Sequence, residues 1–289
     1  MISKLKAKYM DRHLSTIIFD IGQLNTSDSL QEFVNNTKLE VVTDYAECAE
    51  FGGDRLKHSF MVTDNRRAAF FALNNGIGIA VYTNGINNAS DFPEALYCIE
   101  RISDMTDINL EKMYRRANGI PWDILETDRC LVREITVDDV DDLYRIYDDD
   151  ETKLYIEDLY ANREDEIRFT EEYIANQYRF YEFGLWVVSL KSNPNALIGR
   201  TGIFTRDGQD EVEIGFVFDK KYWGMGIASE VLLSIIKYAR EEHDITELVA
   251  NVHIDNFRSM RLLEKLGFRY NKQSEVDGKP YSQYIYTST

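Results

Sequence analysis

Two glycines at the start of a helical segment are the residues whose placement first suggests chemistry in this chain. Gly224 and Gly226 lie between an apolar run at 211–218 and a helical pattern at 228–242. Because glycine lacks a Cβ, backbone N–H groups beside it can close around a ligand, and the N-terminus of a helix favours an anion. The spacing predicts a nest for a phosphate group, with an ordinary tight turn as the alternative.

Two linked motifs place these glycines in a wider pattern. The run "EIGFVFDKKYWGMGIASEVL" is followed further along the chain by "NVHIDNFRSMRLLEKLGF". Over roughly residues 129–289 the chain resembles the GNAT acetyltransferases, in particular the Rim-type branch that acetylates protein N-termini. In that family a Gln/Arg-x-x-Gly-x-Gly/Ala loop binds the pyrophosphate of acetyl-coenzyme A, and here lysine replaces the usual arginine or glutamine. The residues that fill the two motifs are Lys221, Gly224, Gly226, Asn256, Ser259, Leu266, Gly267 and Phe268.

The resemblance implies a binding mode for acetyl-coenzyme A, with no metal. Backbone amides at 223–227 would take the pyrophosphate, and the strand before the loop would pair with the pantetheine arm. An N–H group freed where that strand separates from 247–254 would polarise the thioester carbonyl, which is worth about 3 kcal/mol for one such donor. The residues expected to bind the coenzyme are Phe216, Val217, Phe218, Lys221, Trp223, Gly224, Met225, Gly226, Ile227, Ala228, Asn256 and Ser259.

Acetyl transfer also needs a neutral acceptor amine. At pH 7.4 a lysine amine with a pKa of about 10.4 costs about 4 kcal/mol to deprotonate, whereas an α-amine with a pKa of about 7.8 costs under about 1 kcal/mol. Rim-type enzymes place a glutamate just before "Ile-Gly" on this strand, so the resemblance implies that Glu213 is the general base, directly or through a water. The alternatives are that Glu213 is a solvent-facing strand residue, or that His253 is the base.

The position of the usual general acid departs from the family pattern. Many GNAT enzymes carry a tyrosine four residues before the glycine of Leu-Gly-Phe, and Leu263 stands there in this chain. Either Ser259 assists the departing thiolate, or the thiolate leaves to solvent, or Ser259 only packs its helix. The leading hypothesis is an acetyl-coenzyme-A-dependent N-acetyltransferase that acts on a primary amine in a ternary complex. The alternative is an acyl-coenzyme-A-binding sensor or interaction protein with little activity.

The C-terminal half, residues 123–289, must supply the elements that position these groups. The resemblance implies the GNAT fold, an α/β fold with a mixed, mostly antiparallel sheet and flanking helices. An acceptor site is expected between the helices at 137–180 and the last hairpin. The predicted strands cover 130–135, 185–190, 196–204, 211–218, 247–254 and a stretch near 281–287, and the predicted helices cover 137–147, 164–180, 228–242 and 256–267, with helix or loop at 151–162.

The N-terminal half, residues 1–122, predicts a smaller α/β domain with a parallel, Rossmann-like sheet. Its β-branched runs predict strands at 14–22, 39–43, 59–63 and 77–83. Asp64 is expected to cap the helix that ends at Gly76. The segment weakly resembles the haloacid-dehalogenase-like (HAD-like) fold, but Gly22 stands where a second acid should follow Asp20. We therefore expect a degenerate domain without phosphatase activity.

Composition limits the partners of the chain. Its 289 residues carry 33 Lys and Arg against 50 Asp and Glu, a formal charge of −17, which disfavours broad binding to nucleic acid or to an anionic membrane. No run approaches the roughly 20 apolar residues that span a bilayer. Three cysteines without zinc-type spacing predict reduced thiols and a cytoplasmic protein. The expected partner is a peptide N-terminus or a small cationic amine, with a homodimer possible.

Overall fold

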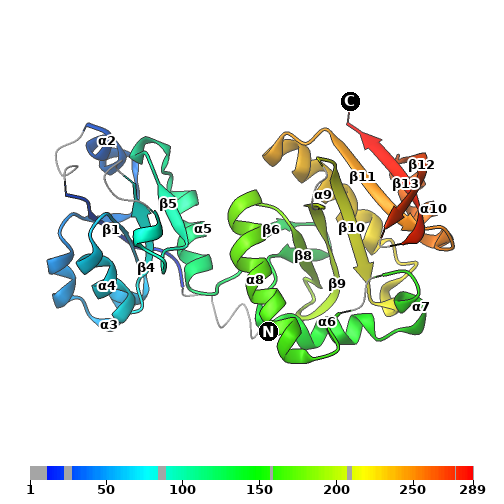
Figure 1. The fold of residues 1–289 in the computed structure, drawn as a ribbon, viewed down its shortest axis with the longest axis horizontal. Coiled ribbons are helices and arrows are strands. Elements are labelled where there is room, and N and C mark those ends of the chain that lie inside the picture. The colour runs from blue at the N-terminus through cyan, green and yellow to red at the C-terminus, as the bar shows by residue number, and fades with distance from the viewer. Residues whose placement is uncertain are drawn as a thin grey trace. The chain divides into compact units, whose positions relative to one another are not determined.

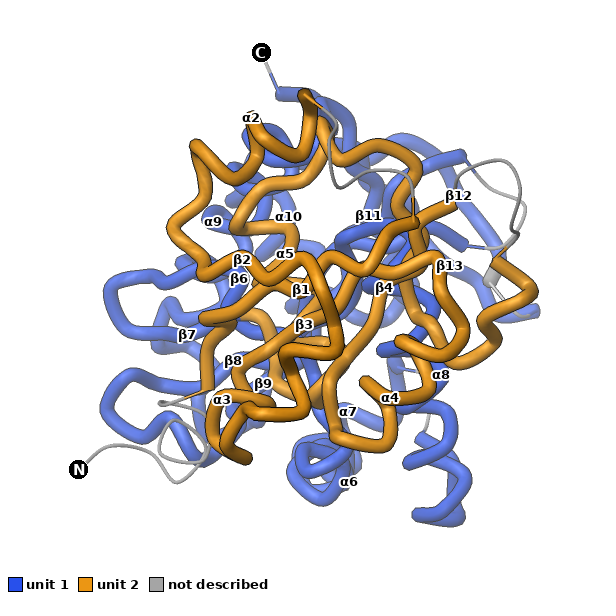
Figure 2. Tube along the Cα trace, turned by 90° about the vertical axis from the view of Figure 1, so that its left-hand side faces the viewer, with its two compact units in different colours: residues 1, 123–289 blue, residues 2–122 orange. Residues whose placement is uncertain are grey.

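The chain divides into two compact units, residues 2–122 and residues 123–289 (Figures 1 and 2). The structure is a computed structural model that describes residues 12–22, 28–83, 89–156, 159–206, 210–276 and 278–288. Each unit has its own sheet and its own buried core. The units are described separately below.

The N-terminal unit is a parallel sheet covered by helices on both faces. Its strand order is β2-β1-β3-β4-β5, and every pairing is parallel. Helices α2 and α5 pack on one face through residues such as Phe33, Leu110 and Tyr114, and α4 packs on the other through three alanines. The strands are Thr16–Asp20 (β1), Glu40–Val42 (β2), Ser59–Thr63 (β3), Gly78–Tyr82 (β4) and Tyr97–Ile99 (β5), and the helices are Asp28–Asn36 (α2), Gly53–Lys57 (α3), Arg66–Asn74 (α4) and Asp107–Ala117 (α5).

The prediction that Asp64 caps helix α4 is wrong by one residue. Asn65 is the cap, because its extended backbone lets its side-chain oxygen accept from the N–H of Arg67 at 2.9 Å. The carboxylate of Asp64 instead accepts from the N–H of Gly22 at 3.1 Å. Burial raises the pKa of the neighbouring Asp20 above its ordinary value. Over the part of the chain that the structure describes, no group of three or more His, Cys, Asp or Glu is placed to hold a metal ion.

The C-terminal unit is built on one mixed sheet of eight strands, which confirms the predicted fold class. The strand order is β12-β13-β11-β10-β9-β8-β7-β6. Neighbours are antiparallel except β10 and β11, which run parallel and pair only at Glu213 and Val249. The strands are Asp123–Glu126 (β6), Cys130–Arg133 (β7), Leu185–Leu190 (β8), Asn193–Thr205 (β9), Val212–Phe218 (β10), Glu247–His253 (β11), Arg269–Val276 (β12) and Lys279–Thr287 (β13).

In the described residues of this unit, five helices flank the sheet. Helix α9 buries Val231, Ile235 and Ala239 along one side, at the spacing of a core-facing helix. Among the described residues of the segment 151–162, which could have been helix or loop, only 151–153 are helical. The helices are Val140–Tyr147 (α6), Asp150–Lys153 (α7), Arg163–Tyr181 (α8), Ile227–His243 (α9) and Phe257–Lys265 (α10).

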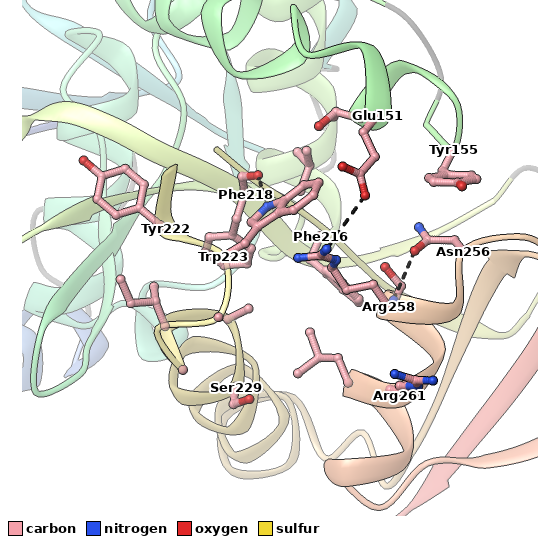
Figure 3. A pocket seen from close by; sticks show the side chains of 18 of the residues that line it. Glu151, Tyr155, Phe216, Phe218, Tyr222, Trp223, Ser229, Asn256, Arg258 and Arg261 are labelled. Atoms are coloured by element: carbon pink, nitrogen blue, oxygen red, sulfur yellow. Dashed lines mark hydrogen bonds and ion pairs between the residues drawn. The ribbon is translucent and has the colours of Figure 1, made fainter. Parts of the chain in front are cut away.

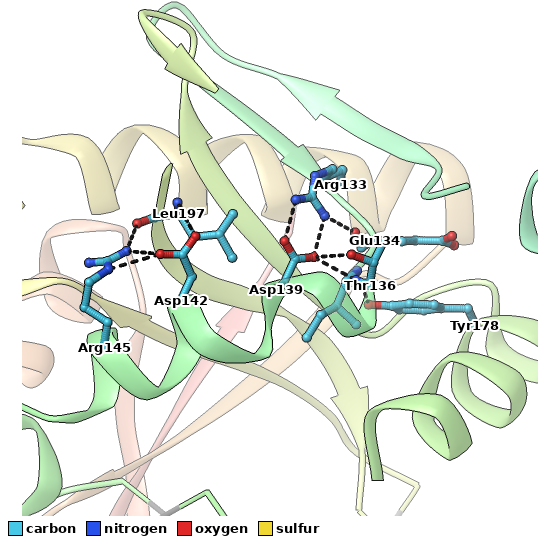
Figure 4. Close-up of polar contacts among 9 residues, drawn as sticks. Arg133, Glu134, Thr136, Asp139, Asp142, Arg145, Tyr178 and Leu197 are labelled. Carbon is cyan, nitrogen blue, oxygen red and sulfur yellow. Dashed lines mark hydrogen bonds and ion pairs between the residues drawn. The ribbon is translucent and has the colours of Figure 1, made fainter. Parts of the chain in front are cut away.

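Ion pairs fix helix α6 against the sheet (Figure 4). Arg133 of β7 donates both terminal nitrogens to the Asp139 carboxylate, each at 2.7 Å, in a buried fork-to-fork pair. Arg145, further along, donates to the carbonyl of Leu197 at 2.7 Å and to the carboxylate of Asp219 at 2.6 Å. Helix α6 is thereby joined to Asp219, the residue that follows β10 and precedes the two glycines Gly224 and Gly226.

Candidate functional site

The segment from Asp219 to Gly226, called the glycine segment below, connects β10 to α9. The Asp219 carboxylate accepts from the N–H of Lys221 at 3.1 Å and caps a short 3-10 turn. Gly224 and Gly226 then adopt φ values of 76° and 77°, and helix α9 begins at Ile227. Side chains with a Cβ avoid this left-handed region, so both glycines are required by the backbone path.

The glycine segment presents unpartnered N–H groups. In the described part of the chain, the backbone N–H groups of Gly224 to Ser229 have no hydrogen-bond acceptor. The N–H of Trp223, which was expected to bind pyrophosphate, instead donates to the carbonyl of Lys220 at 3.1 Å and closes the 3-10 turn. These free donors lie at the N-terminus of a helix of 17 residues, whose dipole adds to their attraction for an anion.

A cavity of about 410 Å³ lies beside these donors (Figure 3). It is bounded by the end of β10, the glycine segment, the N-terminus of α9, one face of α10 and the segment around α7. Its lining includes most of the residues predicted to bind the coenzyme: Phe216, Val217, Phe218, Trp223, Gly224, Gly226, Ile227, Ala228, Asn256 and Ser259. The predicted residues Lys221 and Met225 do not line it, and their side chains are exposed.

Three basic residues of α10 complete the cavity wall, and sequence reasoning missed them. Arg258, Arg261 and Lys265 line the cavity from one face of the helix. The Arg258 guanidinium lies 4.5 Å from the ring centre of Trp223 and 3.9 Å from the carboxylate of Glu151. Figure 3 shows the three side chains, with the ion pair between Arg258 and Glu151 as a dashed line. The spacing of Arg258, Arg261 and Lys265, three and four residues apart, is that of one helix face and could have indicated a shared cationic surface.

The open side of β10 leads into this cavity. Because β10 and β11 pair at one position only, the backbone of Phe216 to Phe218 has no partner strand on the β11 side. The other edge of β10 is fully paired with β9. The side-chain oxygen of Asn256, just after β11, caps α10 by accepting from the N–H of Ser259 at 3.1 Å. The separation of the two strands that the resemblance implied is therefore present.

Glu213 lies outside this cavity lining and is held in a polar cluster. Its side chain is 6 % exposed, so it is not the solvent-facing residue of the alternative interpretation. One carboxylate oxygen accepts from Arg206 Nε at 2.7 Å and from Asn251 Nδ2 at 3.0 Å, and the other accepts from Arg206 Nη2 at 3.2 Å. The role of Glu213 as general base stays a prediction.

The other candidates for proton transfer are also placed. His253 packs between the rings of Tyr155 and Tyr281, each with its centre at 5.6 Å, and its Nδ1 accepts from the N–H of Asp255 at 3.3 Å. In the neutral ring this hydrogen bond leaves the proton on Nε2, which makes that atom a donor. Leu263, at the position where the resemblance implied a tyrosine acid, is fully buried in the core.

Comparison with known proteins identifies the domain that carries this site. Residues 129–269 match the family model described as "Acetyltransferase (GNAT) domain". The uncharacterized N-acetyltransferase YoaA of Bacillus subtilis is 28% identical over 170 residues, which is 57% of this chain and 95% of YoaA. The uncharacterized N-acetyltransferase YnaD of the same organism is 28% identical over 145 residues, 50% of this chain and 82% of YnaD.

A solved structure agrees on the fold. The ribosomal L7/L12 alpha-N-protein acetyltransferase RimL, in its apo form, superposes with a TM-score of 0.50 at 16% identity, covering 59% of this chain and 96% of RimL. The C-terminal unit thus contains an acetyltransferase (GNAT) domain over residues 129–269, and proteins similar to this chain are named N-acetyltransferases. The family model matches within the C-terminal unit, and the HAD-like resemblance of the N-terminal unit stays a prediction. In the described ranges no helix is long and apolar enough to cross a membrane.

Proposed function

We propose that the protein transfers the acetyl group of acetyl-coenzyme A to a primary amine, by direct attack in a ternary complex. The observation that carries the proposal is the row of unpartnered N–H groups from Gly224 to Ser229 at the edge of the cavity. A diphosphate placed against them would meet the N-terminal dipole of α9 and the basic face of α10 together. That combination suits an anionic, elongated coenzyme better than a neutral ligand.

The rest of the cavity fits the other parts of acetyl-coenzyme A. Arg261 and Lys265 would contact phosphate oxygens, and Trp223 with Arg258 stacked on its ring would form an amphipathic wall. The backbone of Phe216 to Phe218 has no partner strand on the β11 side and offers hydrogen-bonding groups there to the amides of the pantetheine arm, while the Phe218 carbonyl already accepts from Trp223 Nε1 at 2.7 Å. This arrangement directs the thioester towards the point where β10 and β11 separate. The acetyl donor supplies an activated carbonyl, and this chain's residues bind and orient it.

The acceptor side favours an amine that is already neutral. The amine nitrogen must form a bond to the thioester carbonyl carbon while the carbon–sulfur bond breaks, and the amine proton must leave. Glu213 already accepts hydrogen bonds from Arg206 and Asn251, so both of its carboxylate oxygens are engaged with other side chains. An α-amine needs less help from a base than a lysine amine, by about 3 kcal/mol. We therefore favour an N-terminal α-amine, as in RimL, over a lysine-like acceptor.

A sensor that binds the coenzyme without much turnover is the second candidate. Two observations favour it: the ion pair that engages Glu213, and the buried leucine at position 263 in place of a tyrosine acid. Both candidates require coenzyme binding, and only the first requires release of free thiol in the presence of an amine.

A binding assay and a turnover assay together test the proposal. Acetyl-coenzyme A at 100 times its Kd should stabilise the chain by about 2.7 kcal/mol, measured by thermal or chemical unfolding. Thiol release should then be followed with peptides bearing a free N-terminus, the same peptides with a blocked N-terminus, polyamines and aminoglycosides. Absence of stabilisation at millimolar coenzyme would refute both candidates, and stabilisation without thiol release from any amine would leave the sensor.

A further inference from the structure

The tight turn between β6 and β7 reaches the first turn of α9 through a dense set of hydrogen bonds. One oxygen of the Glu230 carboxylate accepts from the Thr127 hydroxyl at 2.6 Å and from the backbone N–H of Arg129 at 2.9 Å. The other oxygen accepts from Arg129 Nε at 2.6 Å. Three donors thus converge on one carboxylate in the first turn of the helix that bears the anion-binding N-terminus.

The same arginine also contacts the glycine segment. Arg129 Nη1 donates to the backbone carbonyl of Met225 at 3.0 Å. In a trans peptide the C=O of one residue and the N–H of the next point in opposite directions. When Arg129 holds the Met225 carbonyl, the N–H of Gly226 is therefore directed away from Arg129. Gly226 lines the cavity, so that donor is available to a ligand there.

We propose that Arg129 is a positioning residue for coenzyme binding, which fixes the orientation of the Met225–Gly226 peptide through its contacts with Met225 and Glu230. These contacts are called the Arg129 clamp below. The inference rests on the proposed function, because the clamp matters only if the glycine segment binds the diphosphate. Arg129 itself does not line the cavity and would not touch the coenzyme.

The glycine segment needs such a clamp because its own residues do not fix the peptide. Gly226 supplies the nitrogen of this peptide and Gly224 precedes Met225, and glycine adopts left-handed and right-handed conformations at similar cost. Gly226 is the N-cap of α9 and has no side chain to fix the helix start. A flip of the Met225–Gly226 peptide would turn a carbonyl oxygen towards the phosphates, where it would repel them.

The position of Arg129 is itself well fixed. Its backbone carbonyl accepts from the N–H of Lys191 at 2.8 Å, so both of its backbone polar groups are engaged. Burial alone would raise the pKa of Glu230, but the hydrogen bonds from Thr127 and Arg129 outweigh it and lower the pKa below the ordinary value of 4.5. The Glu230 carboxylate therefore stays charged at neutral pH and keeps the guanidinium oriented.

The test compares Arg129→Gln and Arg129→Lys in the full-length chain, with Arg66→Gln as the control. Arg66 is an exposed arginine of α4 in the N-terminal unit, is ion-paired with Glu94 and is not among the residues that line the cavity. Two acetyl donors are used with the best acceptor amine: acetyl-coenzyme A, and acetyl-pantetheine, which lacks the diphosphate. Isothermal titration with acetyl-coenzyme A gives the Kd of each variant directly.

Arg129→Gln should raise the Kd and the KM for acetyl-coenzyme A about tenfold or more, which corresponds to one charge-assisted hydrogen bond. The kcat should change little, and kcat/KM with acetyl-pantetheine should stay within about twofold of wild type, a selectivity that a general structural defect would not produce. Arg129→Lys should recover part of the affinity, because lysine can reach one partner but lacks the fork that binds both. Arg66→Gln should match wild type.

Two outcomes would overturn the inference. One is an unchanged Kd for acetyl-coenzyme A in Arg129→Gln, and the other is an equal loss of activity with both donors. If wild type itself fails to bind acetyl-coenzyme A, the proposed function fails first, and this result is distinct from either outcome.

Discussion

Substitution of Gly224 by alanine tests whether the glycine segment serves binding as well as chain geometry. Gly224 has a φ of 76°, and a Cβ built there meets no atom within 4 Å. The cost to stability therefore comes from backbone strain alone, about 1–2 kcal/mol, and is partly offset because alanine restricts the unfolded chain. We expect a net loss of about 1 kcal/mol and a fall in Tm of about 2–4 °C for a unit of this size.

Gly76→Ala is a matched control in the N-terminal unit. Gly76 has a φ of 70°, and a Cβ there also meets nothing within 4 Å. Its strain should equal that of Gly224→Ala, but Gly76 lies after helix α4 and far in sequence from the cavity residues. The two variants should thus lose similar stability and differ only in their affinity for the coenzyme.

The expected loss of affinity follows from the N–H groups. If alanine at 224 relaxes towards a negative φ, the amides at 224 and 225 rotate away from the cavity. Each lost charge-assisted hydrogen bond is worth about 1.5–3 kcal/mol, or about a 10- to 100-fold rise in Kd. Isothermal titration with acetyl-coenzyme A measures this change, and differential scanning calorimetry measures the stability. A Kd within about threefold of wild type, together with the same stability loss as Gly76→Ala, would refute the role of these amides.

Three further expectations follow. Glu213→Gln should leave the Kd for acetyl-coenzyme A unchanged and reduce kcat about 10²–10⁴-fold if Glu213 is a true base, whereas full turnover across pH 6–9 would make it a structural residue. Alkylation of the folded chain at pH 8, followed by mass spectrometry, should label Cys98 first, because Cys98 is exposed. Burial raises the pKa of Cys48 to about 11 and also raises the pKa of Cys130, so these two thiols should react slowly. Rapid labelling of all three cysteines would contradict the fold. Because the pKa of Glu230 is lowered in the folded chain, its ionised carboxylate stabilises the fold above pH 4.5, and this stabilisation is lost as the pH falls through the pKa of the folded state. The urea midpoints of wild type and Glu230→Gln should therefore differ at pH 7 and converge in acid.

The fold followed from the sequence wherever strands are apolar and buried. Strands β3 and β8 have the predicted bounds, 59–63 and 185–190, because each is a continuous apolar run with β-branched residues. Strands β5, β6 and β12 were not predicted. All three lie at sheet edges: β5 has three residues, β6 has four, and β12 is largely polar and exposed, so none carries the hydrophobic pattern of a long buried strand.

The candidate site was only partly predictable, for a related reason. Gly224 and Gly226 were found because an unusual backbone conformation demands an unusual residue. The basic residues of α10 look like any solvated helix face until the fold turns them towards a cavity. The contact between Arg129 and Met225 joins residues 96 positions apart, and nothing in either local sequence pairs them.

The single pairing position between β10 and β11 has a consequence for how this domain is completed. Beyond Glu213 in β10 and Val249 in β11, the facing edges of these two strands have no strand partner, so the sheet contains an internal edge. A ligand lying in that gap would act as a short surrogate strand, and the sheet would be continuous only in the complex. We therefore expect amide hydrogen exchange at Phe216 and Phe218 to slow when the ligand binds, because no neighbouring strand protects that edge of β10 in the free chain.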